Sequence, residues 1–67
     1  MNYRQNYRQA KTDEERYHAM AYVPYTEWQV ISRWEDEAKS EKYRKIFHDA
    51  AISLYHREED SIGNFNI

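Results

Sequence analysis

Apolar residues recur with a helical period in the second half of the chain. From residue 43 to residue 55 they occupy every third and fourth position without a gap: Tyr43, Ile46, Phe47, Ala50, Ala51, Leu54 and Tyr55. This spacing places them on one face of an α-helix. It predicts a helix over about residues 41–61, with Ser40 as its N-cap and Gly63 as its C-cap.

A shorter helix is predicted over about residues 13–22. Thr12 and Glu15 have the spacing of a capping box, in which the threonine oxygen accepts from the amide of residue 15 and the Glu15 carboxylate reaches back. Pro24 pushes the residue before it out of the α region, so the helix is expected to end there. Its expected buried face consists of Tyr17, Met20 and Ala21.

A helix between these two is predicted over about residues 27–38. Thr26 and Gln29 repeat the spacing of the capping box. A broad apolar face follows, formed by Trp28, Val30, Ile31, Trp34 and Ala38. The stripe loses its phase after Ala38, so a turn is expected at residues 39–40.

Together the three helices predict an all-α fold. One Gly and one Pro leave little turn chemistry for a sheet. We expect a small three-helix arrangement built on an antiparallel helical hairpin of the second and third helices, with the first packed across it. The side chains expected at its core are Trp34, Ile46, Phe47 and Leu54.

The chain divides into three parts: a basic Tyr/Arg segment over residues 1–11, a helical domain over residues 12–62 and a tail over residues 63–67. The basic segment is expected to be either frayed or helical. One longer helix that joins it to the first predicted helix is an alternative, although Glu14 would then lie on the apolar seam. In the tail, Phe65 or Ile67 is expected to fold back over the hairpin.

Composition points to an aromatic core with little stability to spare. The 67 residues include seven Tyr, two Trp and two Phe but no Cys, which excludes disulfides and thiolate metal sites. A single core of this size supplies only about 3–5 kcal/mol, so binding to a partner or to a second copy would stabilise it. Rings outside the core are candidate binding anchors, because aromatic side chains are enriched at binding hot spots.

These features predict a protein-binding module that acts as an inhibitor, adaptor or regulatory subunit on another protein. The exposed anchors are expected to be Tyr3, Tyr7, Tyr22, Tyr25 and Trp28. Nucleic-acid binding through Tyr3, Arg4, Tyr7 and Arg8 is the alternative, since rings stack on bases and arginines meet phosphates. It is disfavoured because the three cations of residues 1–11, which are Arg4, Arg8 and Lys11, do not make a basic stripe on a protein of pI about 5.9.

Charges on the third predicted helix oppose its dipole. Lys42, Arg44 and Lys45 stand in its first turns, and Glu58, Glu59 and Asp60 in its last. In the hairpin, the acidic residues 35–37 are expected to lie beside the basic turns and compensate them. An antiparallel homodimer that pairs basic ends with acidic ends is a second interpretation, with a structural homo-oligomer as its functional form. Binding of the acidic turns to a foreign basic surface is the third.

No reaction centre is predicted. The chain has no Cys, no Gly-rich loop and no nucleophile elbow, so we expect no enzyme activity and no cofactor. The side chains that can bind a metal are His18, His48, His56, Asp49 and Asp60, but none has paired-ligand spacing and no metal is expected. There is neither a run of ~20 apolar residues nor a secretory signal, so the expected location is the cytoplasm, with no membrane contact.

Overall fold

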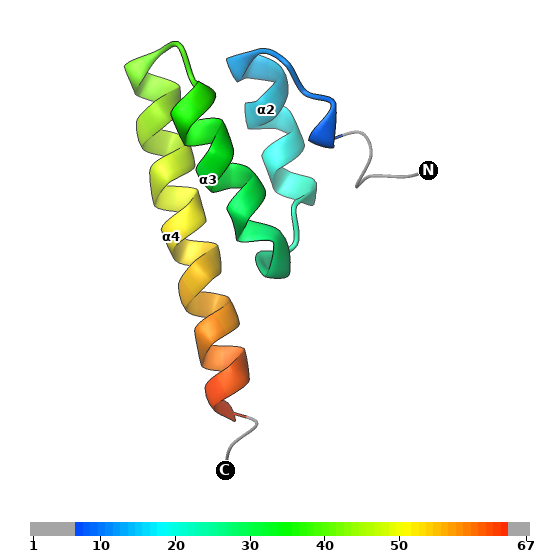
Figure 1. The fold of residues 1–67 in the computed structure, drawn as a ribbon, viewed down its shortest axis with the longest axis vertical. Coiled ribbons are helices and arrows are strands. Elements are labelled where there is room, and N and C mark those ends of the chain that lie inside the picture. The colour runs from blue at the N-terminus through cyan, green and yellow to red at the C-terminus, as the bar shows by residue number, and fades with distance from the viewer. Residues whose placement is uncertain (1–6, 65–67) are drawn as a thin grey trace.

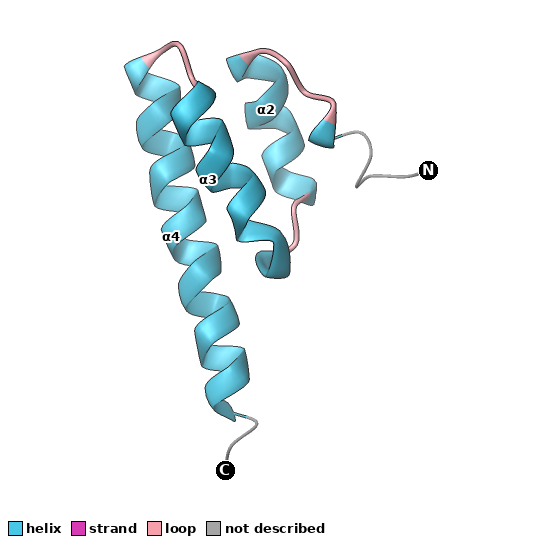
Figure 2. Cartoon of the chain, viewed as in Figure 1, coloured by secondary structure: helices cyan, strands magenta, loops and turns pink. Residues whose placement is uncertain are grey.

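The computed structural model describes residues 7–64 and the side chains of residues 7–61, and it folds as three helices (Figure 1). The elements are α2 (Asp13–Ala19), a 3-10 turn (Met20–Tyr22), a second 3-10 turn (Tyr25–Glu27), α3 (Trp28–Glu37) and α4 (Glu41–Asn64). Residues 7 and 8 also have helical backbone. Loops join these elements, and the described residues contain no strand (Figure 2). The predicted all-α class is confirmed.

The helical hairpin consists of α3 and α4, which run antiparallel and contact each other extensively (Figure 1). The turn between them falls at residues 38–40, close to its predicted place. The α2 helix lies beside the hairpin and contacts α4. The predicted three-helix arrangement is therefore confirmed, and α4 extends as its longest element.

The two predicted capping boxes have different outcomes. The Thr12 hydroxyl oxygen accepts a hydrogen bond from the amide of Glu15 at 3.1 Å, and the same hydroxyl donates to the Glu15 carboxylate at 3.0 Å. Thr26 does not cap α3, because the backbone already turns at Tyr25 and places Thr26 inside a 3-10 turn. Extended backbone at Pro24 precedes that turn.

The C-terminal boundary of α4 was predicted too early. The helix continues through Gly63 to Asn64, and Gly63 does not have a positive φ. A C-cap glycine ends a helix by adopting the left-handed conformation, which this one does not. The predicted fold-back of the tail concerns Phe65 and Ile67, which lie outside the described residues.

The core lies where the hairpin, α2 and the N-terminal segment meet. Its buried side chains are Tyr7, Val23, Ile31, Trp34, Ala38, Phe47 and Ala51. The rings of Trp34 and Phe47 meet edge to face with centroids 5.8 Å apart. Ile46 and Leu54 pack against this cluster while remaining half-buried. The four residues expected at the core are all in or against it.

The buried face of α2 differs from the prediction. Tyr17 is 43% exposed and Ala21 is exposed, whereas Arg16 is buried. The Arg16 guanidinium lies 3.0 Å from the Glu37 carboxylate and 3.5 Å from that of Asp13. These charged contacts turn Arg16 toward the hairpin, since a buried cation must be paired.

Asp13 fixes the start of α2 against the turn of the hairpin. Its carboxylate accepts the backbone amides of Lys39, at 3.1 Å, and Ser40, at 2.9 Å. Backbone donors at the turn have no helical partner of their own, so this carboxylate satisfies them. The contact holds the start of α2 against the hairpin turn, and the ring of Tyr17 meets that of Tyr43 in α4 edge to face, with centroids 5.7 Å apart.

Candidate functional site

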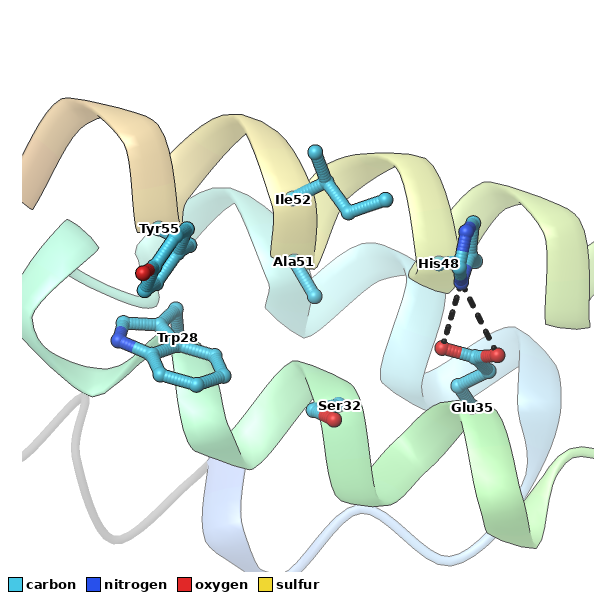
Figure 3. A pocket seen from close by; sticks show the side chains of 7 residues that line it. All are labelled: Trp28, Ser32, Glu35, His48, Ala51, Ile52 and Tyr55. Carbon is cyan, nitrogen blue, oxygen red and sulfur yellow. Dashed lines mark hydrogen bonds and ion pairs between the residues drawn. The ribbon is translucent and has the colours of Figure 1, made fainter.

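A groove of about 290 Å³ runs between α3 and α4 on the surface of the hairpin (Figure 3). It is lined by Trp28, Ser32, Glu35, His48, Ala51, Ile52 and Tyr55. Trp28 and Tyr55 stand at one end, Glu35 and His48 at the other, and the small side chains of Ser32 and Ala51 lie between them (Figure 3). The groove therefore has an apolar end and a charged end.

Helical periodicity positions both walls. On α3 the lining residues are Trp28, Ser32 and Glu35, and on α4 they include His48, Ile52 and Tyr55. Each set follows the spacing i, i+4, i+7, which keeps side chains on one helix face. The middle of the groove is hollow because a serine and an alanine stand where larger side chains would close it.

The apolar end is formed by two rings in contact. The rings of Trp28 and Tyr55 meet edge to face, with centroids 5.2 Å apart and an interplanar angle of 77°. Next to them, Ile52 keeps 42% of its surface exposed and Tyr55 keeps 43%. The indole N–H of Trp28 is buried without a hydrogen-bond partner among the described residues. This end offers apolar area that the chain itself leaves open to solvent.

The charged end is held by one pair. Nδ1 of His48 lies 3.1 Å from both carboxylate oxygens of Glu35, which joins α4 to α3. Beyond it, a second hollow of about 340 Å³ is bordered by Glu35, Glu41, Arg44, Lys45 and His48. Both signs of charge therefore stand at this end.

Tyr55 has a perturbed phenol. A hydrogen bond with the Glu59 carboxylate, one turn farther along α4, raises the pKa of Tyr55, and the negative charges of Glu59 and Glu58 raise it further. Near neutral pH the phenol is therefore protonated and acts as a hydrogen-bond donor at the rim of the groove.

The predicted aromatic anchors are dispersed. Trp28 is half-buried and lines the groove, Tyr25 is half-buried in the 3-10 turn before α3, and Tyr22 is exposed. Tyr7 is only 2% exposed, so its prediction as an exposed anchor was wrong. The ring packs among the buried side chains of the core. Tyr3 and Arg4 lie outside the described residues.

The charged side chains predicted to bind a partner lie in different parts of the structure. Arg8 contacts the Glu27 carboxylate at 3.1 Å, so its guanidinium is already paired with an acid. With Tyr7 in the core, these two residues present no free ring and cation to a nucleic acid. Glu59 and Asp60 are exposed on α4, while Glu58 is half-buried.

The acidic residues at the end of α3 pair with other side chains than the basic residues of α4 that were expected. Glu35 contacts His48 and Glu37 contacts Arg16 of α2. Lys42, Arg44 and Lys45 make no ion pair with any described residue. Arg44 instead donates to the carbonyl of Ala38 at 3.1 Å, and the ammonium of Lys42 lies over the ring of Tyr43.

Sequence reasoning missed Ile52 and the pairing of His48 with Glu35. The signal was a second stripe on α4, in which His48, Ile52 and Tyr55 stand at i, i+4 and i+7 beside the core stripe. An exposed isoleucine at the centre of such a stripe is the feature that indicates a contact surface.

The groove has an apolar floor with a few polar groups fixed at its rim. In the part of the chain that the structure describes, no three His, Asp or Glu side chains gather to hold a metal. Across residues 7–64, no helix combines the length and the apolar content that a bilayer crossing requires. An apolar floor with a few fixed polar groups suits an inserted side chain from another molecule.

Comparison with known proteins finds no family model that matches this chain, and no similar curated protein or solved structure.

Proposed function

We propose that this protein is a small helical protein-binding module that docks through the groove between α3 and α4. The observation that carries the proposal is the apolar surface on the α4 wall of the groove, where Ile52 and Tyr55 keep about two-fifths of their area in water. In a domain with so few aliphatic residues, leaving an isoleucine outside the core forgoes stability that the fold needs.

The energetic gain from docking is appreciable for a surface this small. Complete burial of an exposed isoleucine side chain contributes roughly 1.5–3 kcal/mol, and covering the 42% of Ile52 that is still exposed would contribute about two-fifths of that. The neighbouring Trp28 belongs to a residue type enriched at hot spots, and its ring already stands in place against Tyr55. Because both walls are helices, little ordering of the groove is required on binding.

The charged end supplies orientation. The carboxylate of Glu35 and the ring of His48 are fixed at one end of the groove, and Trp28 stands at the other. A partner fits when its apolar side chain lies against the rings and its polar group lies at the charged end. In the opposite orientation the polar group would lie against the rings without a hydrogen-bond partner. This polarity suits an inhibitor, adaptor or regulatory subunit, whose action is binding itself.

The test compares two variants that add the same charge to neighbouring positions. Ile52→Glu places a carboxylate on the α4 wall of the groove, and Ser53→Glu places one on an exposed position of α4 outside the groove. Tagged wild-type protein and both variants are incubated with lysate of the native host, and retained proteins are identified by mass spectrometry.

We expect the wild type and Ser53→Glu to retain the same foreign protein and Ile52→Glu to lose it. Circular dichroism checks that both variants remain helical. Retention of the same foreign protein by Ile52→Glu would overturn the proposal, as would the absence of any foreign protein retained by the wild type.

A further inference from the structure

The solvent face of α4 is centred on Ile52. On a helix that turns about 100° per residue, the positions within about 60° of Ile52 form one stripe. Its described members are Glu41, Lys45, His48, Asp49, Ile52, Tyr55, His56 and Glu59, and all of them are exposed. The buried residues Phe47 and Ala51 point to the other side of the helix. Ile52 is therefore the aliphatic centre of a face that the chain leaves uncovered.

Charges on this stripe are arranged oppositely on the two sides of Ile52. Lys45 lies two turns before it and Glu59 two turns after it, so the two are equally distant from the centre. Asp49 and His56 lie about one turn away on either side. A copy of α4 laid antiparallel along the same face, centred on the same isoleucine, sets Lys45 opposite Glu59 and Asp49 opposite His56.

A parallel arrangement of the same two helices is unfavourable. It would place Lys45 against the second Lys45 and Glu59 against the second Glu59, and like charges at close range repel. Lys45 makes no ion pair with any described residue of its own chain. The charge pattern therefore favours the antiparallel orientation, in which the α4 face of one copy is complementary to the α4 face of the other.

From these relationships we propose that the partner covering this face is a second copy of the chain, docked antiparallel through α4 with the twofold axis at Ile52. The inference rests on the proposed function, because it names the occupant of the apolar end of the groove. The two Ile52 side chains meet at the axis, and Tyr55 of each copy lies beside His48 of the other. Two Lys45–Glu59 pairs close the interface, one on each side of the axis.

The expected interface is small. A helix the length of α4 is about 36 Å long, and two such helices in contact bury less than the ~1,200 Å² typical of stable complexes. The dimer is therefore expected to exchange with monomer, with half dissociation in a range of roughly 10 μM to 1 mM, as for weak interfaces. Reversible association of this kind leaves the groove available to a foreign protein.

Charge exchange tests the orientation directly. Sedimentation equilibrium is measured from about 10 μM to 1 mM for the wild type, Lys45→Glu, Glu59→Lys and the double exchange K45E/E59K, with Ser53→Glu as the control. In an antiparallel dimer each single exchange sets like charges against each other twice, whereas the double exchange restores both pairs with reversed sign.

We expect a dimer for the wild type and for Ser53→Glu, at least a tenfold weaker association for each single exchange, and recovery to within about threefold for the double exchange. Both positions are exposed on α4, where substitutions usually change stability little, so folding is expected to be retained. A wild type that stays monomeric at 1 mM would overturn the proposal, as would single exchanges that associate like the wild type, or a double exchange that does not recover.

The outcome separates this inference from the proposed function. Lys45 does not line the groove and makes no contact with its rings, so Lys45→Glu leaves the ring surface for a foreign protein unchanged. A monomeric wild type that still retains a foreign protein in an Ile52-dependent way overturns the dimer alone. Charge-dependent dimers without any foreign protein overturn the docking function and leave the dimer standing.

Discussion

The ring of Trp28 in α3 meets the ring of Tyr55 in α4 edge to face, with centroids 5.2 Å apart. This contact joins the two helices beyond the buried pair of Trp34 and Phe47 and forms the apolar wall of the groove. The contact between Trp28 and Tyr55 stabilises the fold, and both side chains also line the groove that a partner would enter. The same residues are therefore expected to contribute to both stability and binding.

The two rings are predicted to be energetically coupled. A double-mutant cycle of Trp28→Leu and Tyr55→Leu tests this. The summed losses in melting temperature of the two single variants should exceed the loss of the double variant by about 2–12 °C. The reason is that either substitution alone removes the whole ring contact. Thermal unfolding followed by circular dichroism measures it, and strictly additive losses would contradict the contact.

The phenol of Tyr55 is predicted to titrate above its usual range. The hydrogen bond with Glu59 and the nearby negative charges favour the protonated phenol, so its pKa is raised in the folded state. The stability that this contact adds is fully present below the pKa of the unfolded chain and is lost as the pH rises through the folded pKa. Absorbance titration should show the Tyr55 pKa falling toward its ordinary value in Glu59→Gln. An unchanged titration in that variant would exclude the contact.

Tyr7 is predicted to be essential for folding. The side chain is 2% exposed, and replacing a buried ring of this size with alanine costs about 3–5 kcal/mol. That is comparable to the whole stability expected of a core this small, so Tyr7→Ala should be largely unfolded at 25 °C. Tyr7→Phe keeps the ring and should remain folded. Circular dichroism distinguishes them, and a Tyr7→Ala variant with wild-type helicity and melting temperature would refute the burial of this residue.

Asp13 is predicted to matter far more than its acidic neighbour. Asp13→Ala removes the acceptor of two backbone amides at the hairpin turn and should lower the free energy of unfolding by about 1–3 kcal/mol. Glu14→Ala is the matched control, because the Glu14 side chain is exposed and its contact with His18 is long at 4.0 Å. This substitution should change the free energy of unfolding by less than about 0.5 kcal/mol. Urea denaturation measures both. Equal losses would show that the dipole of α2, rather than the turn, explains the effect.

The local period of apolar residues was sufficient to predict the fold. The helices end within a few residues of their predicted boundaries because caps such as Thr12 and breakers such as Pro24 act over one turn. The antiparallel hairpin followed from the short link between two amphipathic helices. Gly63 was misjudged because a glycine permits a helix end without requiring one.

The contacts of α2 and the groove depend on distant parts of the chain. Burial of Arg16 requires Glu37 to arrive beside it, and the position of Asp13 is set by amides of the hairpin turn. The groove exists because Ser32 of α3 faces the small Ala51 of α4, which depends on how far one helix is shifted along the other. No spacing within a single helix carries that information.

Site-specific photocrosslinking in the native host tests whether the face around Ile52 is covered by another polypeptide. A benzophenone side chain replaces Ile52 in one variant and His18, exposed on α2 and outside the groove, in the other. On irradiation, we predict crosslinked products of higher mass at position 52 and none at position 18. No product at position 52, or products of equal yield at both positions, would contradict binding through this face.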